Sequence, residues 1–330
     1  MAEHRAPPRP GTAVPAGGVM GAPAGAGLGA PAGRGTAAPP GTMALFKYEA
    51  LGNDFLVFLD AEGRSPLTAE LARAACDRHR GWGADGLLRA SPAPAWREQM
   101  GFELRNADGS EAETSGNGLR CLVHAAMDEG LLDATGVAFD VLTPAGRRRV
   151  QVRERRPGWM WAATEMGVPK VRGGQELCHV GYGQLMVDVG NPHLVVLGPD
   201  PAALDVAALG PALSEEAGKS TGGANVEFVA LGPGPDELRM RVWERGVGET
   251  LACGSGSVAA AAALRHWGRV GTKVMVNQLG GAVQVELGPD GAATLSGPSR
   301  RVGQCWFPAH FPSRPSTPVN SAGKPFGGAP

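Results

Sequence analysis

The fold is organised around residues 244–263, which read ERGVGETLACGSGSVAAAAA. The alanine-rich run favours a helix, and the pattern predicts that this helix begins beside Gly254-Ser255-Gly256. Unpaired backbone N–H groups and the helix dipole stabilise anions at such an N-terminus. We therefore expect Cys253 to ionise more easily than a free thiol, whose pKa is about 8.5. The same N–H groups are suited to hold a carboxylate.

The same device occurs a second time, earlier in the chain. Residues 106–121 read NADGSEAETSGNGLRC, and Ser115-Gly116-Asn117-Gly118 matches Cys253-Gly254-Ser255-Gly256 at a spacing of 138 residues. The same spacing relates three further pairs: Glu111 and Glu249, Asn106 and Glu244, Gly52-Asn53 and Gly190-Asn191. A register kept over so long a span indicates a duplicated unit. We therefore expect two facing helix N-termini with a site between them.

The remaining pattern predicts many short strands and few helices, which is typical of an α+β fold. Apolar runs predict strands at 45–60, 101–105, 226–230 and 238–243. Thr68 is placed to cap a helix over Thr68–Arg80, and another helix is expected over Leu204–Glu216. The arginines between 147 and 156 are expected to form a solvated face.

Composition limits the class of protein. The length of 330 residues allows two domains of ordinary size, and the formal net charge of −1 gives no reason to expect a nucleic acid or a membrane as partner. Five cysteines without a CxxC pair indicate a reducing compartment, which favours the cytoplasm. No apolar run approaches the roughly 18 residues that a membrane span needs.

The two ends differ in composition from the middle of the chain. Of the first 42 residues, 29 are Ala, Gly or Pro, and no apolar face is visible, so we expect residues 1–42 to be a disordered extension. Residues 312–330 are expected to be a disordered tail. Between these ends we expect an N-terminal domain at 43–160 and a C-terminal domain at 161–298. A final strand near 299–311 is expected to return to the first domain.

Other motifs in the chain suggest different chemistry but lack the necessary context. Gly254-Ser255-Gly256 resembles part of a dinucleotide fingerprint, which needs an early βαβ unit and a following acid that this chain lacks. Cys76 with His79 and Cys121 with His124 have zinc-like spacings, but no third ligand cluster accompanies them. We therefore expect no metal. None of the five lysines lies in a recognisable pyridoxal phosphate setting, so we expect no cofactor.

These motifs resemble the diaminopimelate epimerases, in the cofactor-independent racemase superfamily that includes proline racemase. Six segments carry the resemblance, in family order: GNDF at 52–55, CDRHRGWGADG at 76–86, residues 106–121, GNPH at 190–193, NVEF at 225–228 and residues 244–256. The resemblance implies two similar domains, each a strand-rich barrel around a central helix, with the active site in the cleft between them. It also implies a homodimer.

The resemblance further implies roles for the matching residues. Cys253 is the acid/base thiol on one face of the substrate, and the amides of Gly116, Asn117, Gly254 and Ser255 hold its α-carboxylate. Glu244 and Arg245 are implied to contact the α-ammonium and a distal carboxylate. The distal amino acid end is read by Asn53, Asn106, Asn191 and Asn225, since an amide both donates and accepts. His193 orients the site. For each asparagine, and for His193, a purely local turn role is the structural alternative.

The chain departs from the family at two positions. Ser115 stands where the family carries its other catalytic cysteine, and Gly86 stands near the position of a glutamine that contacts the distal end. A serine hydroxyl is a far weaker acid than a thiol and needs another group to activate it. Ser115 could relay a proton through water, Glu111 or Glu113. Otherwise Cys253 acts alone, in a one-base enzyme on another amino acid or a lyase, or the protein is a catalytically silent diaminopimelate-binding protein.

The sequence therefore predicts a cytoplasmic, cofactor-independent isomerase. The expected reaction is the interconversion of LL- and meso-diaminopimelate by proton abstraction and return at Cα. This reaction serves lysine and peptidoglycan precursor biosynthesis. The expected partner is a small amino acid substrate.

Overall fold

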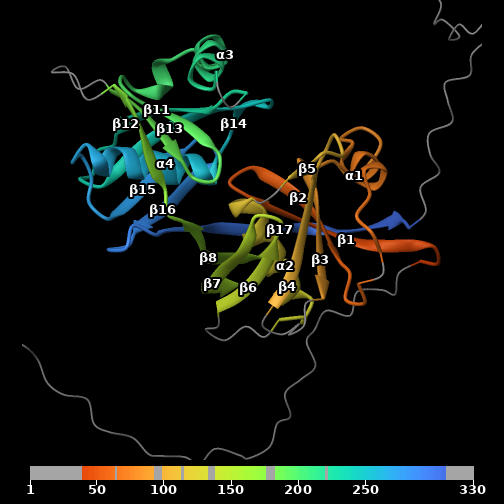
Figure 1. Cartoon of the computed structure of the whole chain (residues 1–330). Helices are drawn as coiled ribbons and strands as arrows, with labels where there is room; N and C mark the ends of the chain where they lie inside the picture. The colour runs from red at the N-terminus through yellow and green to blue at the C-terminus, as the bar shows by residue number, and fades with distance from the viewer. Residues whose placement is uncertain are drawn as a thin grey trace, which may run out of the picture. The chain divides into compact units, whose positions relative to one another are not determined.

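The computed structural model describes residues 39–63, 65–92, 99–112, 115–132, 138–175, 183–219 and 222–309, and it has the predicted α+β class (Figure 1). The helices are α1 (Ala69–Cys76), α2 (Gly116–Asp128), α3 (Val206–Ala217) and α4 (Gly254–His266), with a 3₁₀ turn at Pro201–Ala203. The early strands are β1 (Thr42–Ala50), β2 (Asn53–Leu59), β3 (Gly86–Pro92), β4 (Gln99–Asn106), β5 (Glu111–Ala112), β6 (Ala138–Thr143), β7 (Gly146–Arg156) and β8 (Trp159–Gly167).

The later strands repeat this order. They are β9 (Lys170–Gln175), β10 (Gly183–Asp188), β11 (Pro192–Leu197), β12 (Asn225–Leu231), β13 (Glu237–Glu244), β14 (Gly248–Thr250), β15 (Lys273–Gln278), β16 (Gly281–Leu287) and β17 (Ala293–Pro308). We call β1–β7 with α1 and α2 the first half, and β9–β16 with α3 and α4 the second half. Strand β17 pairs with β1 of the first half and β16 of the second, and β8 pairs with β7 and β17.

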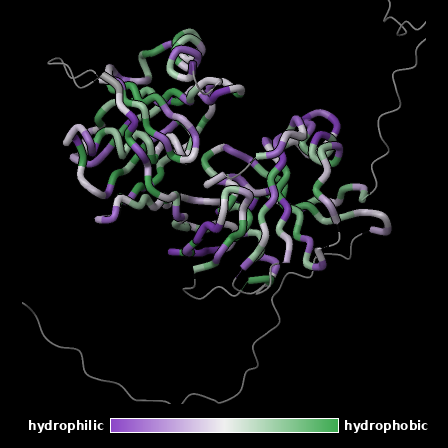
Figure 2. The backbone as a smooth tube through the Cα atoms, in the orientation of Figure 1, coloured by the Kyte–Doolittle hydropathy of each residue, from purple (hydrophilic) through white to green (hydrophobic). Residues whose placement is uncertain are grey.

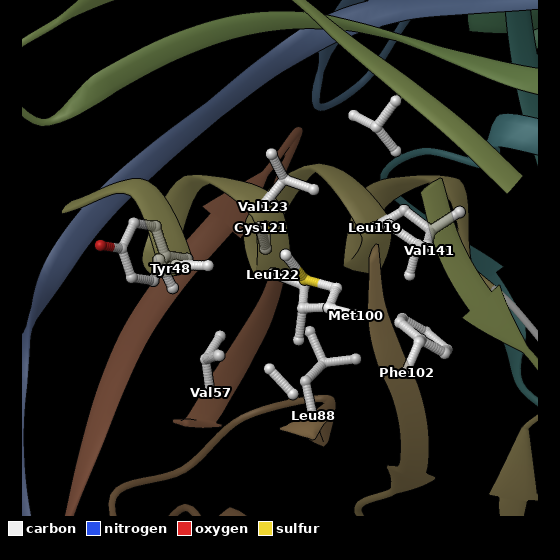
Figure 3. Packing of buried hydrophobic residues seen from close by; sticks show 14 of the residues in the cluster. Tyr48, Val57, Leu88, Met100, Phe102, Leu119, Cys121, Leu122, Val123 and Val141 are labelled. Atoms are coloured by element: carbon white, nitrogen blue, oxygen red, sulfur yellow. The ribbon is translucent and has the colours of Figure 1, made fainter. Parts of the chain in front are cut away.

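The sheet of the first half closes around α2. Strand pairing runs from β1 through β2, β3, β4, β6, β7, β8 and β17, and β17 pairs again with β1. The residues of α2 from Asn117 to Met127 are all buried inside this sheet. Figure 3 shows Leu119 and Leu122 of α2 among Leu88, Met100 and Phe102 of the surrounding strands. The closed sheet fixes where the N-terminus of α2 emerges.

The second half repeats the strand connections of the first around α4, with pairing from β9 through β10, β11, β12, β13, β15 and β16 to β17. The β2–β3 and β11–β12 pairs are both parallel, as are β4–β6 and β13–β15. Helices α2 and α4 have the same length of 13 residues and start 138 positions apart. Gly52 and Gly190, matched at the same spacing, both have a positive φ (+82° and +96°), a conformation that suits glycine. The prediction of a duplicated unit is confirmed.

Strand β17 is the longest, at 16 residues, and it connects the two sheets. Its first residues pair with β16, Ala293–Arg300 pair with β8, and Arg300–Pro308 pair with β1. The C-terminal end of the described chain therefore completes the sheet of the first half. The domain boundaries at 160/161 and 298/299 stay predictions, because β17 pairs with strands of both halves.

The predicted cap of α1 is present, but the predicted helix is too long. Thr68 is the N-cap, and its Oγ1 accepts from Leu71 N at 3.1 Å. The helix ends at Cys76 rather than Arg80, because Asp77 is extended (ψ 119°) and its Oδ1 accepts from the N–H groups of His79 and Arg80. An aspartate side chain that bonds to nearby backbone competes with helix continuation. His79 therefore lies outside the helix.

Most of the two terminal segments lies outside the described residues. Of the segment 1–42, only Pro39–Thr42 is described, and Thr42 already begins β1, one residue before the predicted domain start. The tail 312–330 lies wholly outside. Within the described ranges, no helix is long and apolar enough to cross a membrane. The arginine-rich strand β7 is largely hydrophilic (Figure 2) and mostly exposed.

Burial of α2 predicts a steep dependence of stability on its core side chains. Leu122 is fully buried, so Leu122→Ala should lower the free energy of unfolding by about 2–5 kcal/mol, the usual cost of a core cavity. Leu142 on β6 is 37% exposed, so Leu142→Ala should lower the free energy of unfolding by well under half of the loss in Leu122→Ala. Urea unfolding followed by circular dichroism measures both. Equal losses in the two variants would contradict the enclosed position of α2.

Candidate active site

The two inner helices begin in the same way. Ser115 is the N-cap of α2, and its Oγ accepts from Gly118 N at 3.0 Å. Cys253 is the N-cap of α4, and its Sγ accepts from Gly256 N at 3.4 Å. Both caps are extended, with ψ of 120° and 118°. The hydroxyl and the thiol therefore occupy equivalent positions, each beside the unpaired N–H groups of a first helical turn.

The two N-termini approach the same side chain. A Cβ built on Gly116 would lie 3.3 Å from Cδ2 of Leu295, and one built on Gly254 would lie 2.9 Å from that same atom. Leu295 is fully buried on β17, and α2 and α4 contact each other. Glycine at the first position of each helix allows this approach. Two sets of unpaired amide donors are therefore brought towards one place.

Polar side chains hold the backbone of Cys253. Its N–H donates to Oε1 of Gln278 at 2.8 Å, and its carbonyl accepts from Oγ of Ser257 at 2.8 Å. Gln278 Nε2 in turn donates to Ser257 Oγ at 3.0 Å. The thiol is also 3.5 Å from Oγ of Ser255. This small network holds the backbone of Cys253 on both its N–H and its carbonyl side. Cys253 itself is buried, with 6% of its surface exposed.

A buried carboxylate and imidazole lie under the start of α4. Glu227 and His193 are both fully buried, with Oε1 of Glu227 2.7 Å from Nδ1 of His193. Nε2 of His193 is 2.9 Å from Oδ1 of Asn191. A Cβ on Gly256 would lie 2.6 Å from Oε1 of Glu227, so the carboxylate packs against the first turn of α4, which Cys253 caps. Among the described residues, Glu227 Oε2 has no hydrogen-bond partner.

The expectation that Cys253 ionises easily is wrong. Burial raises the pKa of the Cys253 thiol well above its usual value, and the carboxylates of Glu244 and Glu227 raise it further. The hydrogen bond from Gly256 N acts in the opposite direction and is outweighed. The helix terminus was visible in the sequence, whereas the carboxylates come from β12 and β13. Cys253 is therefore a neutral thiol around neutral pH.

Glu244 ends β13, and Arg245, which follows it, lies beside Asn225. Glu244 Oε1 accepts from Oγ1 of Thr250 at 2.5 Å, and burial together with Glu227 raises the pKa of its carboxyl. Arg245 N donates to Oδ1 of Asn225 at 2.9 Å, and the Arg245 guanidinium reaches Gly223 O at 3.3 Å. Asn225 is thus used partly to hold the turn after β13.

The predicted asparagines of the first half have different surroundings. Asn53 donates to Asp85 Oδ2 at 2.8 Å and accepts from Nδ2 of Asn117 at 3.4 Å. This links the start of β2 to the first turn of α2. Asn106 is exposed and donates to Oγ of Ser110 at 3.0 Å, within its own turn. The structure therefore joins Asn53 to the helix terminus and gives Asn106 a local contact.

The two halves share a backbone arrangement but differ in the side chains behind the helix caps. The positions equivalent to His193, Glu227 and Ser257 are occupied in the first half by Phe55, Leu88 and Leu119, as the paired strands and helices show. Leu88 Cδ2 is 3.4 Å from a Cβ built on Gly118, as Glu227 lies against Gly256. The α4 cap thus rests on a polar layer, whereas the α2 cap rests on an apolar one.

Gly86 lies at the start of β3, where the family resemblance led us to expect a glutamine. A Cβ there would lie 2.9 Å from the carbonyl oxygen of Arg105 and 2.9 Å from Cδ1 of Leu104. Strand β4 therefore packs against Gly86 and leaves no room there for a side chain. Asn225 pairs with β11 in the way that Gly86 pairs with β2, so the two positions are equivalent. Only the second half therefore carries a side-chain amide at this position.

Several residues around the site were not found from the sequence: Asp85, Arg120, Glu227, Ser257 and Gln278. Glu227 stood within the NVEF motif, but its counterpart Leu88 lies 139 residues earlier, so only the strand pairing relates the two. Arg120 and Val258 are 138 residues apart, so comparing them at the repeat spacing would have shown that only the first half carries a charge there. Asp85 and Gln278 lie far from either helix in sequence and carried no comparable signal. Within the described ranges, no group of three or more His, Cys, Asp or Glu side chains could hold a metal ion.

The chain was compared with known protein families and proteins. A family model described as diaminopimelate epimerase matches residues 45–171 and 185–302. The chain belongs to this family. Diaminopimelate epimerase of Corynebacterium glutamicum is 41% identical over 271 residues, covering 78% of this chain and 95% of that protein. The diaminopimelate epimerase of Microcystis aeruginosa is 34% identical over 283 residues, covering 79% and 98%.

Solved structures share the fold of this diaminopimelate epimerase family member. A hydroxyproline epimerase from Agrobacterium vitis, 18% identical, superposes with a TM-score of 0.61 over 83% of this chain and 95% of its own. A phenazine biosynthesis protein from Bacillus anthracis, 16% identical, gives 0.64 over 81% and 99%. At these identities the likeness concerns the fold alone.

The carboxylates beside Cys253 predict how its reactivity depends on pH. In native protein, alkylation of Cys253 by iodoacetamide should rise only well above the usual thiol pKa. Glu244→Gln removes one of the charges that oppose thiolate formation, so it should shift the midpoint of this rise down by roughly one pH unit. Peptide mass spectrometry distinguishes Cys253 from the other cysteines.

Glu249→Gln provides the control for this shift. Glu249 is exposed and ion-paired with Arg241, and it does not contribute to the raised pKa of Cys253. Its removal should leave the midpoint unchanged. An unchanged midpoint in Glu244→Gln as well would contradict a contribution of the Glu244 charge to the raised pKa of Cys253.

Proposed function

We propose that this protein interconverts LL- and meso-diaminopimelate by removing and returning the proton at Cα, without a cofactor. The observation that carries the proposal is the pair of equivalent helix N-termini, capped by Ser115 and Cys253, that approach one buried leucine. Membership of the diaminopimelate epimerase family supports the choice of substrate. Inversion at one carbon requires groups on two opposed faces, which two such termini supply.

The substrate α-carboxylate binds between the two first turns. The amides of Gly116 and Asn117 donate from α2, and those of Gly254 and Ser255 donate from α4. Removing the Cα proton moves negative charge onto this carboxylate, which becomes enolate-like. Fixed amide donors and two helix dipoles stabilise that developing charge more than the ground state. Proton removal thereby becomes accessible without an electron sink.

Cys253 gives or takes the proton on one face. As an acid it is ready, because burial and its two neighbouring carboxylates keep it protonated. As a base it first has to lose that proton. A substrate ammonium held by Glu244 offsets the negative charge near the sulfur and so favours the thiolate. The proton then moves from Cα to Sγ, and the electron pair stays on the carboxylate-stabilised carbon.

Ser115 serves the opposite face through water. Its hydroxyl gives up its proton too poorly to act as the acid, and while protonated it is too weak a base to take one, but its oxygen can position a water beside Cα. Glu111 is mostly exposed and ion-paired with Arg105 at 2.8 Å, which makes it a poor partner for this step. Glu113 lies outside the described residues. We expect the face served by Ser115 to exchange protons more slowly than the face served by Cys253.

The remaining predicted residues bind the rest of the substrate. Arg245 is suited to the distal carboxylate. The distal amino acid end falls to Asn53, Asn106, Asn191 and Asn225. His193 orients Asn191 and Glu227 through its two ring nitrogens. We further propose a cytoplasmic homodimer that supplies lysine and peptidoglycan precursor synthesis.

The proposal is tested by incubating the full chain with LL-diaminopimelate in D₂O and following deuterium at Cα and formation of the meso isomer. Epimerisation predicts deuterium in both pools, abolished by Cys253→Ala. Ser115→Cys should speed turnover by an order of magnitude or more, since it supplies a group whose pKa is nearer the working pH.

Two other outcomes would redirect the assignment. Deuterium in LL-diaminopimelate without meso product would mean one-sided chemistry at Cys253. Binding of diaminopimelate with no exchange at all would mean a silent binding protein. Absence of both binding and exchange would contradict diaminopimelate as the substrate.

A further inference from the structure

Arg120 is a buried cation without a carboxylate partner among the described residues. Its side chain is fully buried in α2, and burial lowers the pKa of the guanidinium to about 10. Its contacts are all with neutral oxygens. Most buried charges in proteins are paired, because an unpaired one is expensive to desolvate. An unpaired cation at this place therefore needs an explanation.

The guanidinium lies directly behind the first turn of α2. Nη1 donates to the carbonyl of Gly116 at 3.1 Å, and Nη2 donates to Oδ1 of Asn117. Nε donates to the carbonyl of Pro298 on β17 at 3.2 Å. A Cβ on Gly297 would lie 3.2 Å from Cζ of Arg120, so a glycine in β17 makes room for it. Three neighbours thus fix the charge in one orientation.

The contact with Gly116 acts on the peptide unit that faces the ligand. The carbonyl of Gly116 and the N–H of Asn117 belong to one peptide group. A charged donor on that carbonyl polarises the group and strengthens its N–H as a donor, as in other hydrogen-bond chains. The same guanidinium also holds the Asn117 side chain, which donates to Asn53 at 3.4 Å.

The second half lacks this feature. At the position equivalent to Arg120, α4 carries Val258, which is also fully buried. The α4 terminus instead rests on Glu227, which places a buried carboxylate behind it. The two otherwise equivalent helix starts therefore differ: a cation supports the α2 terminus, whereas a carboxyl group paired with the His193 imidazole lies under the α4 terminus.

We propose that Arg120 is the positioning residue that makes the α2 terminus the principal carboxylate-binding end of the site. It acts through Asn117 and Gly116 without touching the substrate, and its charge is compensated when the carboxylate binds. The amides of α4 donate to the same carboxylate beside Cys253, which transfers the proton. This inference rests on the proposed function and assigns the stronger carboxylate donors to the first half.

The test measures the affinity for LL-diaminopimelate by calorimetry, in a Cys253→Ala background that prevents turnover. Arg120→Met should weaken binding by about tenfold or more, the scale of one charge-assisted hydrogen bond. Arg120→Lys should bind almost normally at pH 6.5. Its affinity should then fall relative to the parent as pH rises to 8.5, because a buried lysine has a lowered pKa and loses its charge. The parent keeps its arginine charged throughout.

Arg301→Met is the matched control. Arg301 lies against the other end of α2, where it contacts Asp128 and Glu129. This variant should lose some stability but keep its affinity and its pH profile. A purely structural role for Arg120 would not produce the pH-dependent loss in Arg120→Lys.

Each outcome separates this inference from the proposed function. If the parent does not bind diaminopimelate, the proposed substrate is wrong. If the parent binds and Arg120→Lys shows the same pH dependence as the parent, the inference about Arg120 is overturned. Arg120→Lys keeps the test decisive even where Arg120→Met fails to fold, since it retains both length and charge.

Discussion

Surrounding each inner helix with strands determines where this protein can place unpaired backbone N–H groups. The strands bury most side chains of α2 and α4, and the helices use their own backbone donors except in the first turn. Each half therefore presents one set of unpaired N–H groups, at one end. The helix dipole makes that end suitable for anions. A reactive side chain can lie beside those donors only at the cap, which is where Ser115 and Cys253 are found.

The duplicated fold supplies two such ends, and the side chains behind them differ. The first half keeps Phe55, Leu88 and Leu119 where the second has His193, Glu227 and Ser257. Arg120 and Val258 differ in the same way. Shared backbone geometry thus supports unequal electrostatics, since the charges come from side chains behind the helix starts. A thiol with carboxylates nearby suits proton transfer, whereas amides backed by a guanidinium suit charge binding.

The sequence was most informative where a local pattern sets the local structure. The repeated glycine motifs identified both helix starts, and Thr68 identified the start of α1, because caps depend on residues close in sequence. The end of α1 was missed because the Asp77 side chain competes for its backbone. The protonation of Cys253 was missed because its neighbours come from other strands. Arg120 was missed because an arginine within a helix is usually exposed, although the repeat spacing sets it against Val258.

The long strand β17 has a consequence for how the chain is made. Residues 300–308 close the sheet that begins at Thr42, so the first half stays open at one edge until almost the whole described chain has been synthesised. An emerging nascent chain cannot complete its N-terminal half early. It has to hold an unpaired edge strand, a common starting point for misassembly, until the last strand arrives. Pairings this distant in sequence also slow folding.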